Sequence, residues 1–148
     1  MHKFILFLVM TFLLLSSKLF AQQISNVENT SIQASGTYFS ESVKDSKWSN
    51  SNGNSYTKAK YSNYDGETFV KISSIHTKET TLRFDVTVKK GELEIQFVNS
   101  KNEILFQDIF YKSQEKNLEI TLEKDEQYQI KFIGKETKGA YFCQWIEA

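Results

Sequence analysis

Apolar and polar residues alternate along the chain from Thr80 almost to its last residue. Every second side chain of residues 82–88 is large and apolar, and the residues between them are charged or polar. The same pattern returns in residues 93–97, 118–122 and 128–132, and residues 141–146 close the domain. Because a period of two places successive side chains on opposite faces of a β-strand, each segment is predicted to be a strand with one buried face.

Short polar segments separate these predicted strands. Gly91 adopts a positive φ without steric cost, so residues 89–92 are predicted to form a turn. Asparagine tolerates the left-handed region and bonds its own backbone, which predicts a second turn at residues 99–102. Residues 134–139, which begin and end with glycine, are predicted to be a polar loop.

One pair of segments predicts a hairpin, and another segment leaves its register open. Residues 118–122 and 128–132 both alternate, and the polar residues 124–125 between them are predicted to join them as the clearest hairpin of the chain. Residues 104–111 are apolar at both odd and even positions. This segment is therefore either buried on both faces or bulged.

The number of alternating segments decides the fold class. Residues 32–38 and 69–75 suggest two further strands, which makes about seven or eight short strands, and no helical pattern is long enough to compete. The chain is therefore predicted to be all-β, an antiparallel β-sandwich that is jelly-roll-like or Ig-like. Residues 22–148 are one domain of ordinary size. Proline is absent, so lysines and glutamates are expected to protect the sheet edges.

The first 21 residues are predicted to be a cleaved signal peptide. Lys3 precedes an apolar run over residues 4–15, which is too short to span a bilayer of about 20 apolar residues. Ala21 supplies the small residue expected at a cleavage site, and the alternative is an uncleaved N-terminal anchor. Residues 19–22 resemble signal peptides of Bacteroidota. The expected location is therefore secreted or periplasmic, with no membrane insertion after cleavage.

Charge and cysteine content exclude several function classes. Without residues 1–21 the net charge is about −2, which gives no electrostatic basis for binding nucleic acid or an anionic membrane. Arg83 is the single arginine, so a phosphate-clamping enzyme is disfavoured. The single cysteine, Cys143, alternates with Tyr141 and Trp145, and we expect it to be buried as a small core hydrophobe rather than to react. No cofactor is predicted.

A further pattern carries a family resemblance. The alternating residues 80–86, a Lys-Gly turn, residues 93–97 and 128–132, and the terminal Gly139-x-Tyr141 resemble the small β-sandwich modules appended to secreted bacterial proteins, such as pre-peptidase C-terminal domains. The acidic calcium pattern that some of these modules carry is missing, since residues 99–103 offer Glu103 as the lone carboxylate. The resemblance, which covers residues 80–147, implies an accessory or binding role and names no ligand.

Residues 40–66 are polar and rich in aromatic side chains. Such segments bind sugars by stacking rings on their apolar faces while asparagine, aspartate and serine bond the hydroxyls. The candidate ligand-binding residues are Trp48, Tyr56, Tyr61 and Tyr64.

An alternative interpretation makes the same residues structural. Asn52-Gly53 is a strong hairpin signal, and a two-residue turn there would pair Trp48 with Thr57, place Trp48 beside Ala59 and Tyr61 on one face, and put Tyr56 on the other. The rings would then be ordinary packing residues. A calcium site is a weaker alternative, because the acidic loop spacing is missing. Its oxygen ligands would be Asp45, Asn50, Asn52 and Asp65.

The acidic residues and the histidine favour no enzyme class. Glu92, Glu94, Glu119 and Glu123 occupy positions where a solvated strand face needs charge. His76 lies in a predicted turn without two further metal ligands nearby. We therefore predict a non-catalytic module that binds a glycan or a partner protein at the bacterial cell envelope. The alternatives are a small secreted hydrolase with its site in residues 40–66, and a structural module that interacts through a sheet edge.

Overall fold

The computed structural model describes residues 31–40, 43 and 47–148, so the predicted signal peptide lies outside the described residues. These residues contain eight β-strands and no helix, and hence no helix long and apolar enough to cross a membrane. The strands are β1 (Ile32–Ala34), β2 (Tyr38–Phe39), β3 (Ser49–Asn52), β4 (Tyr56–Ser74), β5 (Lys78–Val98), β6 (Ile104–Phe110), β7 (Gln114–Leu122) and β8 (Gln127–Glu147).

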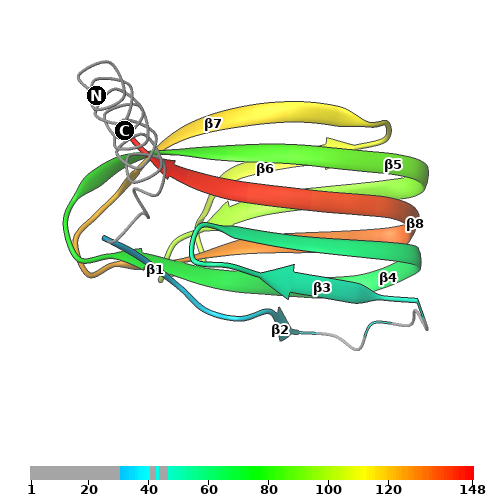
Figure 1. Ribbon diagram of the computed structural model, residues 1–148, viewed down its shortest axis with the longest axis horizontal. Helices are drawn as coiled ribbons and strands as arrows, with labels where there is room; N and C mark the ends of the chain where they lie inside the picture. The colour runs from blue at the N-terminus through cyan, green and yellow to red at the C-terminus, as the bar shows by residue number, and fades with distance from the viewer. Residues whose placement is uncertain (1–30, 41–42, 44–46) are drawn as a thin grey trace, which may run out of the picture.

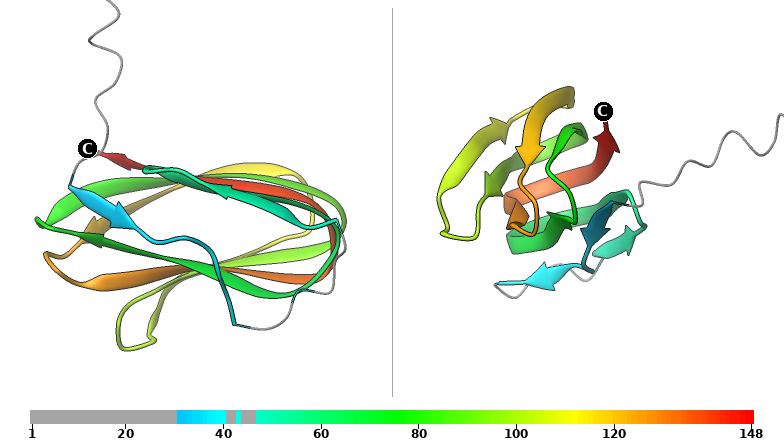
Figure 2. Two further views of the ribbon diagram at one scale, coloured as in Figure 1. Left: turned by 60° about the horizontal axis from the view of Figure 1, so that its bottom comes forward. Right: turned by 90° about the vertical axis from the view of Figure 1, so that its left-hand side faces the viewer.

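The strands form one antiparallel sheet that folds over on itself (Figure 1). The order is β1-β4-β8-β5-β6, with β2 and β3 also paired to β4 and β7 paired to β5. The long strands β4, β5 and β8 each bend near the middle, so that each contributes to two layers that face one another (Figure 2). The predicted antiparallel β-sandwich is confirmed.

Two names describe the halves of the sandwich. Layer A contains β3, β7 and the parts of the long strands at residues 56–61, 78–88 and 139–147. Layer B contains β1, β2, β6 and the parts at residues 66–74, 92–98 and 127–134. Layer A faces the viewer in Figure 1, where the red end of β8 is nearer the viewer than its fainter, orange beginning.

The bends correct two predictions. Residues 89–92 are not a turn between two strands but a bend inside β5, and residues 134–139 are not a loop but a bend inside β8. The β4–β8 and β5–β8 registers shift at these positions, and Gly91 has φ 72°. Glycine and polar residues indicate that a strand does not continue flat. They occur at a bend within one strand as well as at a turn between two strands.

The predicted hairpin of residues 118–122 with 128–132 is wrong. β7 pairs with β5 in layer A, whereas β8 begins in layer B beside the other half of β5. Residues 123–126 therefore cross from one layer to the other. Alternation defines which face of a strand is buried and leaves its partner undefined.

The predicted turn at residues 99–102 and the predicted bulge in residues 104–111 are both present. In the turn at residues 99–102, Asn102 has φ 61° and its N–H donates to the Asn99 carbonyl at 3.0 Å. β6 is the bulged alternative, because Phe97 pairs with Phe106 and Val98 pairs with Ile104, which leaves Leu105 as the extra residue.

The core lies between the two layers. Phe132 of layer B and Tyr141 of layer A stack with ring centroids 3.7 Å apart, and Phe84 stacks on Phe106 across the layers at 6.2 Å. Each large apolar side chain buried this way contributes about 1.5 to 3 kcal/mol before entropy is counted. Cys143 is fully buried in this core, as predicted, and desolvation raises the pKa of its thiol.

Candidate ligand-binding site

Three of the four predicted site residues meet in the interior. The Trp48 ring lies 5.7 Å from the ring of Tyr61 and 4.8 Å from the ring of Tyr64, and Tyr141 completes the group at 6.3 Å from Trp48. Tyr61 is 3% exposed and Tyr64 is 0% exposed. Their ring faces are covered by protein in this structure, and the prediction that Tyr61 and Tyr64 contact a ligand stays a prediction.

The hairpin register explains this burial. β3 and β4 form the predicted hairpin, but Asn52 pairs with Thr57, and the Gly53 N–H donates to the Tyr56 carbonyl at 2.9 Å. The observed turn is longer than the predicted two-residue turn. It places Trp48 at the level of Tyr61, whereas the predicted turn would have placed Trp48 opposite Thr57. The predicted faces hold, since Trp48 and Tyr61 share the inner face while Tyr56 lies on the outer one. The structure thus favours the packing interpretation for the inner rings.

The buried tyrosines differ in their hydrogen bonds. The Tyr64 hydroxyl donates to the Phe132 carbonyl at 2.5 Å and lies 3.2 Å from the Thr68 hydroxyl. The Tyr61 hydroxyl has no hydrogen-bond partner within the described part of the chain. Burial raises the pKa of Tyr61, Tyr64 and Tyr141, so all three stay protonated at neutral pH.

The calcium alternative is not supported by the two asparagines. The Asn52 side-chain oxygen accepts from the Thr57 hydroxyl at 2.6 Å, and that of Asn50 accepts from the Trp48 indole at 3.3 Å. Both oxygens therefore join the hairpin to its neighbours. Asp45 lies outside the described residues, and Asp65 is exposed on β4 at the bend.

Tyr56, the fourth predicted residue, leads to the outer face of layer A. Its ring is half-buried and stacks on Phe142 of β8 with centroids 5.6 Å apart and planes 24° apart. The Lys58 ammonium lies 5.8 Å from the centre of the Tyr56 ring. Strand alternation turns all three side chains outward, because Thr57, Ala59 and Cys143 between them are buried.

Two cross-strand rows order the residues of this outer face. In one row Lys58 of β4 lies opposite Phe142 of β8, and Phe142 lies opposite Asp85 of β5. In the next row Lys60 lies opposite Ala140, and Ala140 lies opposite Thr87. The small side chain of Ala140 leaves space between longer neighbours.

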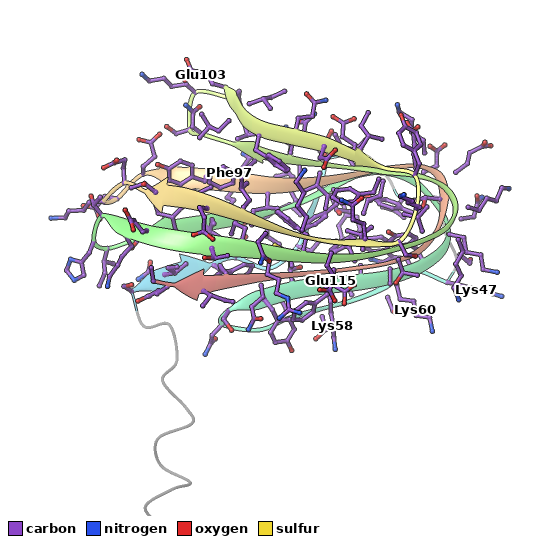
Figure 3. The ribbon with its side chains drawn as sticks, turned by 90° about the horizontal axis from the view of Figure 1, so that it is seen from above. Lys47, Lys58, Lys60, Phe97, Glu103 and Glu115 are labelled. Atoms are coloured by element: carbon purple, nitrogen blue, oxygen red, sulfur yellow. The ribbon has the colours of Figure 1, made fainter. Side chains whose placement is uncertain are left out.

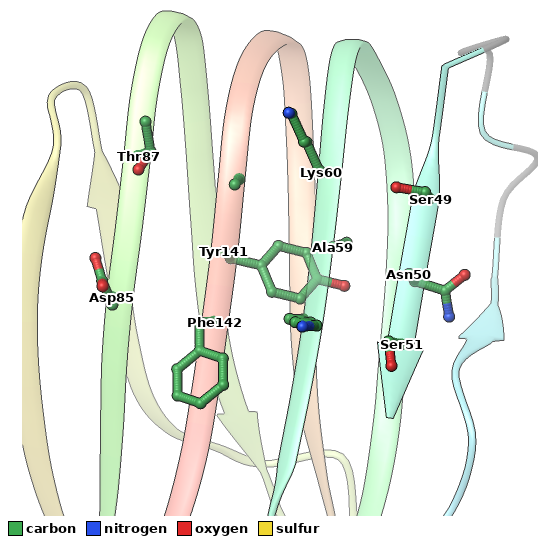
Figure 4. A pocket seen from close by; sticks show the side chains of 11 residues that line it. Ser49, Asn50, Ser51, Ala59, Lys60, Asp85, Thr87, Tyr141 and Phe142 are labelled. Atoms are coloured by element: carbon green, nitrogen blue, oxygen red, sulfur yellow. The ribbon is translucent and has the colours of Figure 1, made fainter. Parts of the chain in front are cut away.

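That space is a hollow of about 420 Å³ on the outer face of layer A, named here the A-face hollow (Figure 4). Figure 4 shows Lys60 and Ser49 on one side of the Phe142 strand and Asp85 and Thr87 on the other. The lining residues come from β3, β4, β5 and β8, and they are Ser49, Asn50, Ser51, Lys58, Ala59, Lys60, Asp85, Thr87, Ala140, Tyr141 and Phe142.

The two walls of the A-face hollow differ in charge. Lys58 and Lys60 lie on the β4 side and Asp85 on the β5 side, and among the described residues none of the three forms an ion pair within 4.0 Å. Figure 3 shows both lysines and Glu115 projecting from the same face of the molecule. Glu115 pairs with Arg83 at 3.6 Å, beyond the Asp85 wall.

None of the four predicted ligand-binding residues lines the A-face hollow. The sequence holds one signal for Phe142: the buried positions Tyr141, Cys143 and Trp145 predict that the residues between them face outward, and an aromatic ring there is unusual. Nothing in the local sequence indicates that Asp85 and Thr87 belong to a binding site. Their proximity to Lys58 and Lys60 depends on β4, β8 and β5 lying side by side, which alternation alone does not predict.

A second, smaller hollow of about 280 Å³ lies on the outer face of layer B beside Tyr38. The Tyr38 ring already stacks on Phe69 at 5.1 Å, and the Lys71 ammonium lies 4.9 Å from its centre. The A-face hollow is the larger of the two and is lined by side chains of both charges, so it is taken as the candidate site.

Among known proteins, this chain is similar in structure to several solved proteins. No family model and no curated protein matches the chain. A family 4 carbohydrate-binding module is 12% identical with a TM-score of 0.44, and the match covers 72% of this chain and 78% of that one. A family 35 carbohydrate-binding module from Clostridium thermocellum is 9% identical with a TM-score of 0.41, covering 78% and 89%. A family 29 module complexed with mannohexaose is 15% identical with a TM-score of 0.40, covering 72% and 79%. At such TM-scores the similarity assigns no ligand to this chain.

Proposed function

We propose that this protein is an exported, non-catalytic module that binds a glycan in the A-face hollow. The observation that carries the proposal is the position of Phe142, an outward-facing aromatic ring at the wall of a hollow that is also lined by hydroxyl, amide and charged side chains. The expected location is the bacterial cell envelope or the medium, which rests on the signal-like pattern of residues 1–21.

The chemistry of sugars fits this arrangement. A pyranose ring has apolar C–H faces that pack on an aromatic ring, and hydroxyls at its edge that need hydrogen-bond partners. Phe142, supported by Tyr56, offers the aromatic surface. Asp85 offers acceptors, Lys60 offers donors, and Ser49 and Thr87 offer hydroxyls that do either.

A partner protein at the envelope is the second candidate. It is favoured by the β7 edge, because β7 pairs with β5 on one side and with no described strand on the other. An edge of this kind can accept an added strand through its backbone groups. The resemblance of residues 80–147 to pre-peptidase C-terminal domains stays a prediction, and it agrees with an accessory role of either kind.

The test is a binding measurement on residues 22–148 with a panel of neutral and acidic polysaccharides, by affinity electrophoresis followed by calorimetry. We expect saturable binding to at least one glycan, weakened about tenfold or more by Phe142→Ala because the stacking surface is lost. Tyr111→Ala is the matched control, since Tyr111 is 67% exposed and does not line the hollow. Binding that Phe142→Ala leaves unchanged, or no binding by the folded protein, would contradict the proposal.

A further inference from the structure

We infer, resting on the proposed function, that the glycan bound in the A-face hollow is acidic and carries a carboxylate sugar. Its carboxylate is bound by Lys58 and Lys60, and the hydroxyls of the same ring are bound by Asp85 and Thr87.

Charge asymmetry is the first step of the argument. Lys58 and Lys60 occupy neighbouring outward positions of β4, and both are exposed without an acidic partner among the described residues. Four other lysines of the described residues form ion pairs, among them Lys131 with Glu67 at 3.5 Å and Lys135 with Glu92 at 2.7 Å. Two unpaired ammonium groups beside an aromatic wall form a site for one negative charge.

The opposite wall limits the negative charge to one side of the ligand. Asp85 lies across Phe142 from Lys58, so Phe142 separates an ammonium group from a carboxylate. Neighbouring strands are about 4.8 Å apart, which makes the distance between the two flanking strands about 10 Å and leaves room for one sugar ring. A ligand with its anion at one edge and hydroxyls at the other satisfies both walls.

A hexuronic acid has this shape. Its carboxylate is attached at C5, and the hydroxyl of C2 lies directly across the ring, with that of C3 beside it. With the ring stacked on Phe142 and the carboxylate toward Lys58 and Lys60, these hydroxyls point toward Asp85, whose two oxygens accept hydrogen bonds from neighbouring hydroxyls. A neutral hexose would leave both lysines without an anion.

The same orientation gives the direction of the polysaccharide. The bonds of a 1,4-linked chain leave the ring through C1 and C4, and the C1–C4 direction is oblique to the C5–C2 direction. Since the C5–C2 direction lies across the strands, such a chain would cross β8 obliquely, near Phe142 and Ala140. The inferred ligand class is a uronic acid polymer, and a 1,4-linked one is taken for the test.

Phosphate and sulfate esters fit this face less well. Arginine is the side chain whose planar fork matches a tetrahedral oxyanion, and the only arginine, Arg83, is engaged by Glu115 at 3.6 Å. Lysine acts as a point charge, which is sufficient for a carboxylate with a charge of −1. The nearby Asp85 would repel a phosphate monoester, with a charge of about −1.5 to −2, more strongly than a carboxylate.

The experiment compares an acidic ligand with its methyl ester, which lacks the negative charge and carries an added methyl group. Calorimetry in the presence of EDTA measures binding of a 1,4-linked oligogalacturonate and of its fully methyl-esterified form to residues 22–148. We expect the acid to bind about tenfold tighter or more, and salt to weaken the binding of the acid but not that of the ester. Lys58→Met with Lys60→Met should reduce the affinity for the acid to that for the ester. Lys101→Met with Lys124→Met, at exposed positions elsewhere, should change neither.

The outcomes separate this inference from the function on which it rests. Equal binding of acid and ester, or an acid affinity unaffected by the Lys58 and Lys60 variant, would overturn the carboxylate inference. Neutral glycans that bind in a Phe142-dependent way while the uronate does not would also overturn it and leave the proposed function intact. Failure of every glycan to bind the folded protein would remove both. Circular dichroism and thermal unfolding confirm that each variant is folded.

Discussion

The aromatic group around Tyr61 and Tyr64 shows how two equally buried residues of the same type contribute differently. The Tyr64 hydroxyl has the Phe132 carbonyl as acceptor, whereas the Tyr61 hydroxyl has no partner among the described residues. A buried hydroxyl without a partner has lost its hydrogen bonds to water and gained none. Tyr64 therefore stabilises the fold through its hydroxyl, and Tyr61 contributes through its ring alone.

Tyr64→Phe and Tyr61→Phe should accordingly have opposite effects on the free energy of unfolding. Tyr64→Phe leaves the buried Phe132 carbonyl without its donor and should lower the free energy of unfolding by about 1 to 3 kcal/mol. Tyr61→Phe removes an unpaired hydroxyl and should leave it unchanged or raise it by up to about 1 kcal/mol. Urea unfolding of both variants measures the difference, and equal destabilisation by the two changes would contradict this account.

At the scale of strands, the bends of β4, β5 and β8 decide the architecture. Each strand passes from layer A to layer B without ending, so one sheet supplies both layers. The bend in β8 needs close approach to β5: at Gly139, which has φ 155°, a Cβ atom would lie 1.8 Å from the Thr87 carbonyl oxygen. Only glycine fits this contact without displacing the β5 backbone.

Gly139→Ala should therefore lower the free energy of unfolding by about 2 to 4 kcal/mol, because the methyl group must push β5 away at the bend. Gly36→Ala is the control, since a Cβ atom there meets nothing within 4 Å. It should leave stability unchanged or raise it by up to about 1 kcal/mol. Thermal and denaturant unfolding give both values, and a Gly139→Ala variant as stable as the Gly36→Ala variant would show that the bend has no such contact.

The sequence predicted strands and their faces better than their partners. Alternation correctly predicted the buried faces around Phe84, Ile130 and Cys143, since burial of one side of a strand is local information. It paired residues 118–122 with the wrong strand. It also predicted a turn at residues 89–92 and a loop at residues 134–139, where β5 and β8 bend. Those features depend on which strands lie side by side in space, and the same local pattern is compatible with several pairings.

Over the whole molecule, the two outer faces present different surfaces. Layer A carries the A-face hollow with its lysine wall and its acidic wall, and layer B carries Tyr38 already contacted by Phe69 and Lys71. The sequence predicted Tyr56 as a ligand-binding residue, and Tyr56 stacks on Phe142 beside the hollow without lining it. It did not predict Phe142, Asp85 or Thr87, because their neighbours come from other parts of the chain.

The buried tyrosines and the buried thiol predict how the whole fold responds to alkaline pH. The pKa values of Tyr61, Tyr64, Tyr141 and Cys143 are raised by burial. Below the pKa values of the unfolded chain, about 8.5 for cysteine and 10 for tyrosine, this stability is fully present. As pH rises further, the unfolded chain loses protons that the folded one keeps, and stability falls by about 1.4 kcal/mol per pH unit for each group.

Denaturant unfolding at a series of pH values from 7 to about 11.5 checks this prediction. We expect a constant midpoint near neutral pH and a steep decline above pH 10 or so. Tyr61→Phe should reduce the slope of this decline, because one buried titrating group is removed. Tyr111→Phe, at an exposed position, should leave the slope unchanged. A midpoint that stays constant up to pH 11 or so would contradict the burial of these groups.

The central claim is that the A-face hollow binds an acidic glycan, and the most direct measurement is the mapping of amide chemical shifts in the folded protein during titration with an oligogalacturonate. The account predicts that the largest shifts fall at residues 58–60, 85–87 and 140–142, which are far apart in the chain and adjacent in layer A. Shifts centred on Tyr38 and Lys71 of layer B, or no shifts at saturating ligand, would contradict it.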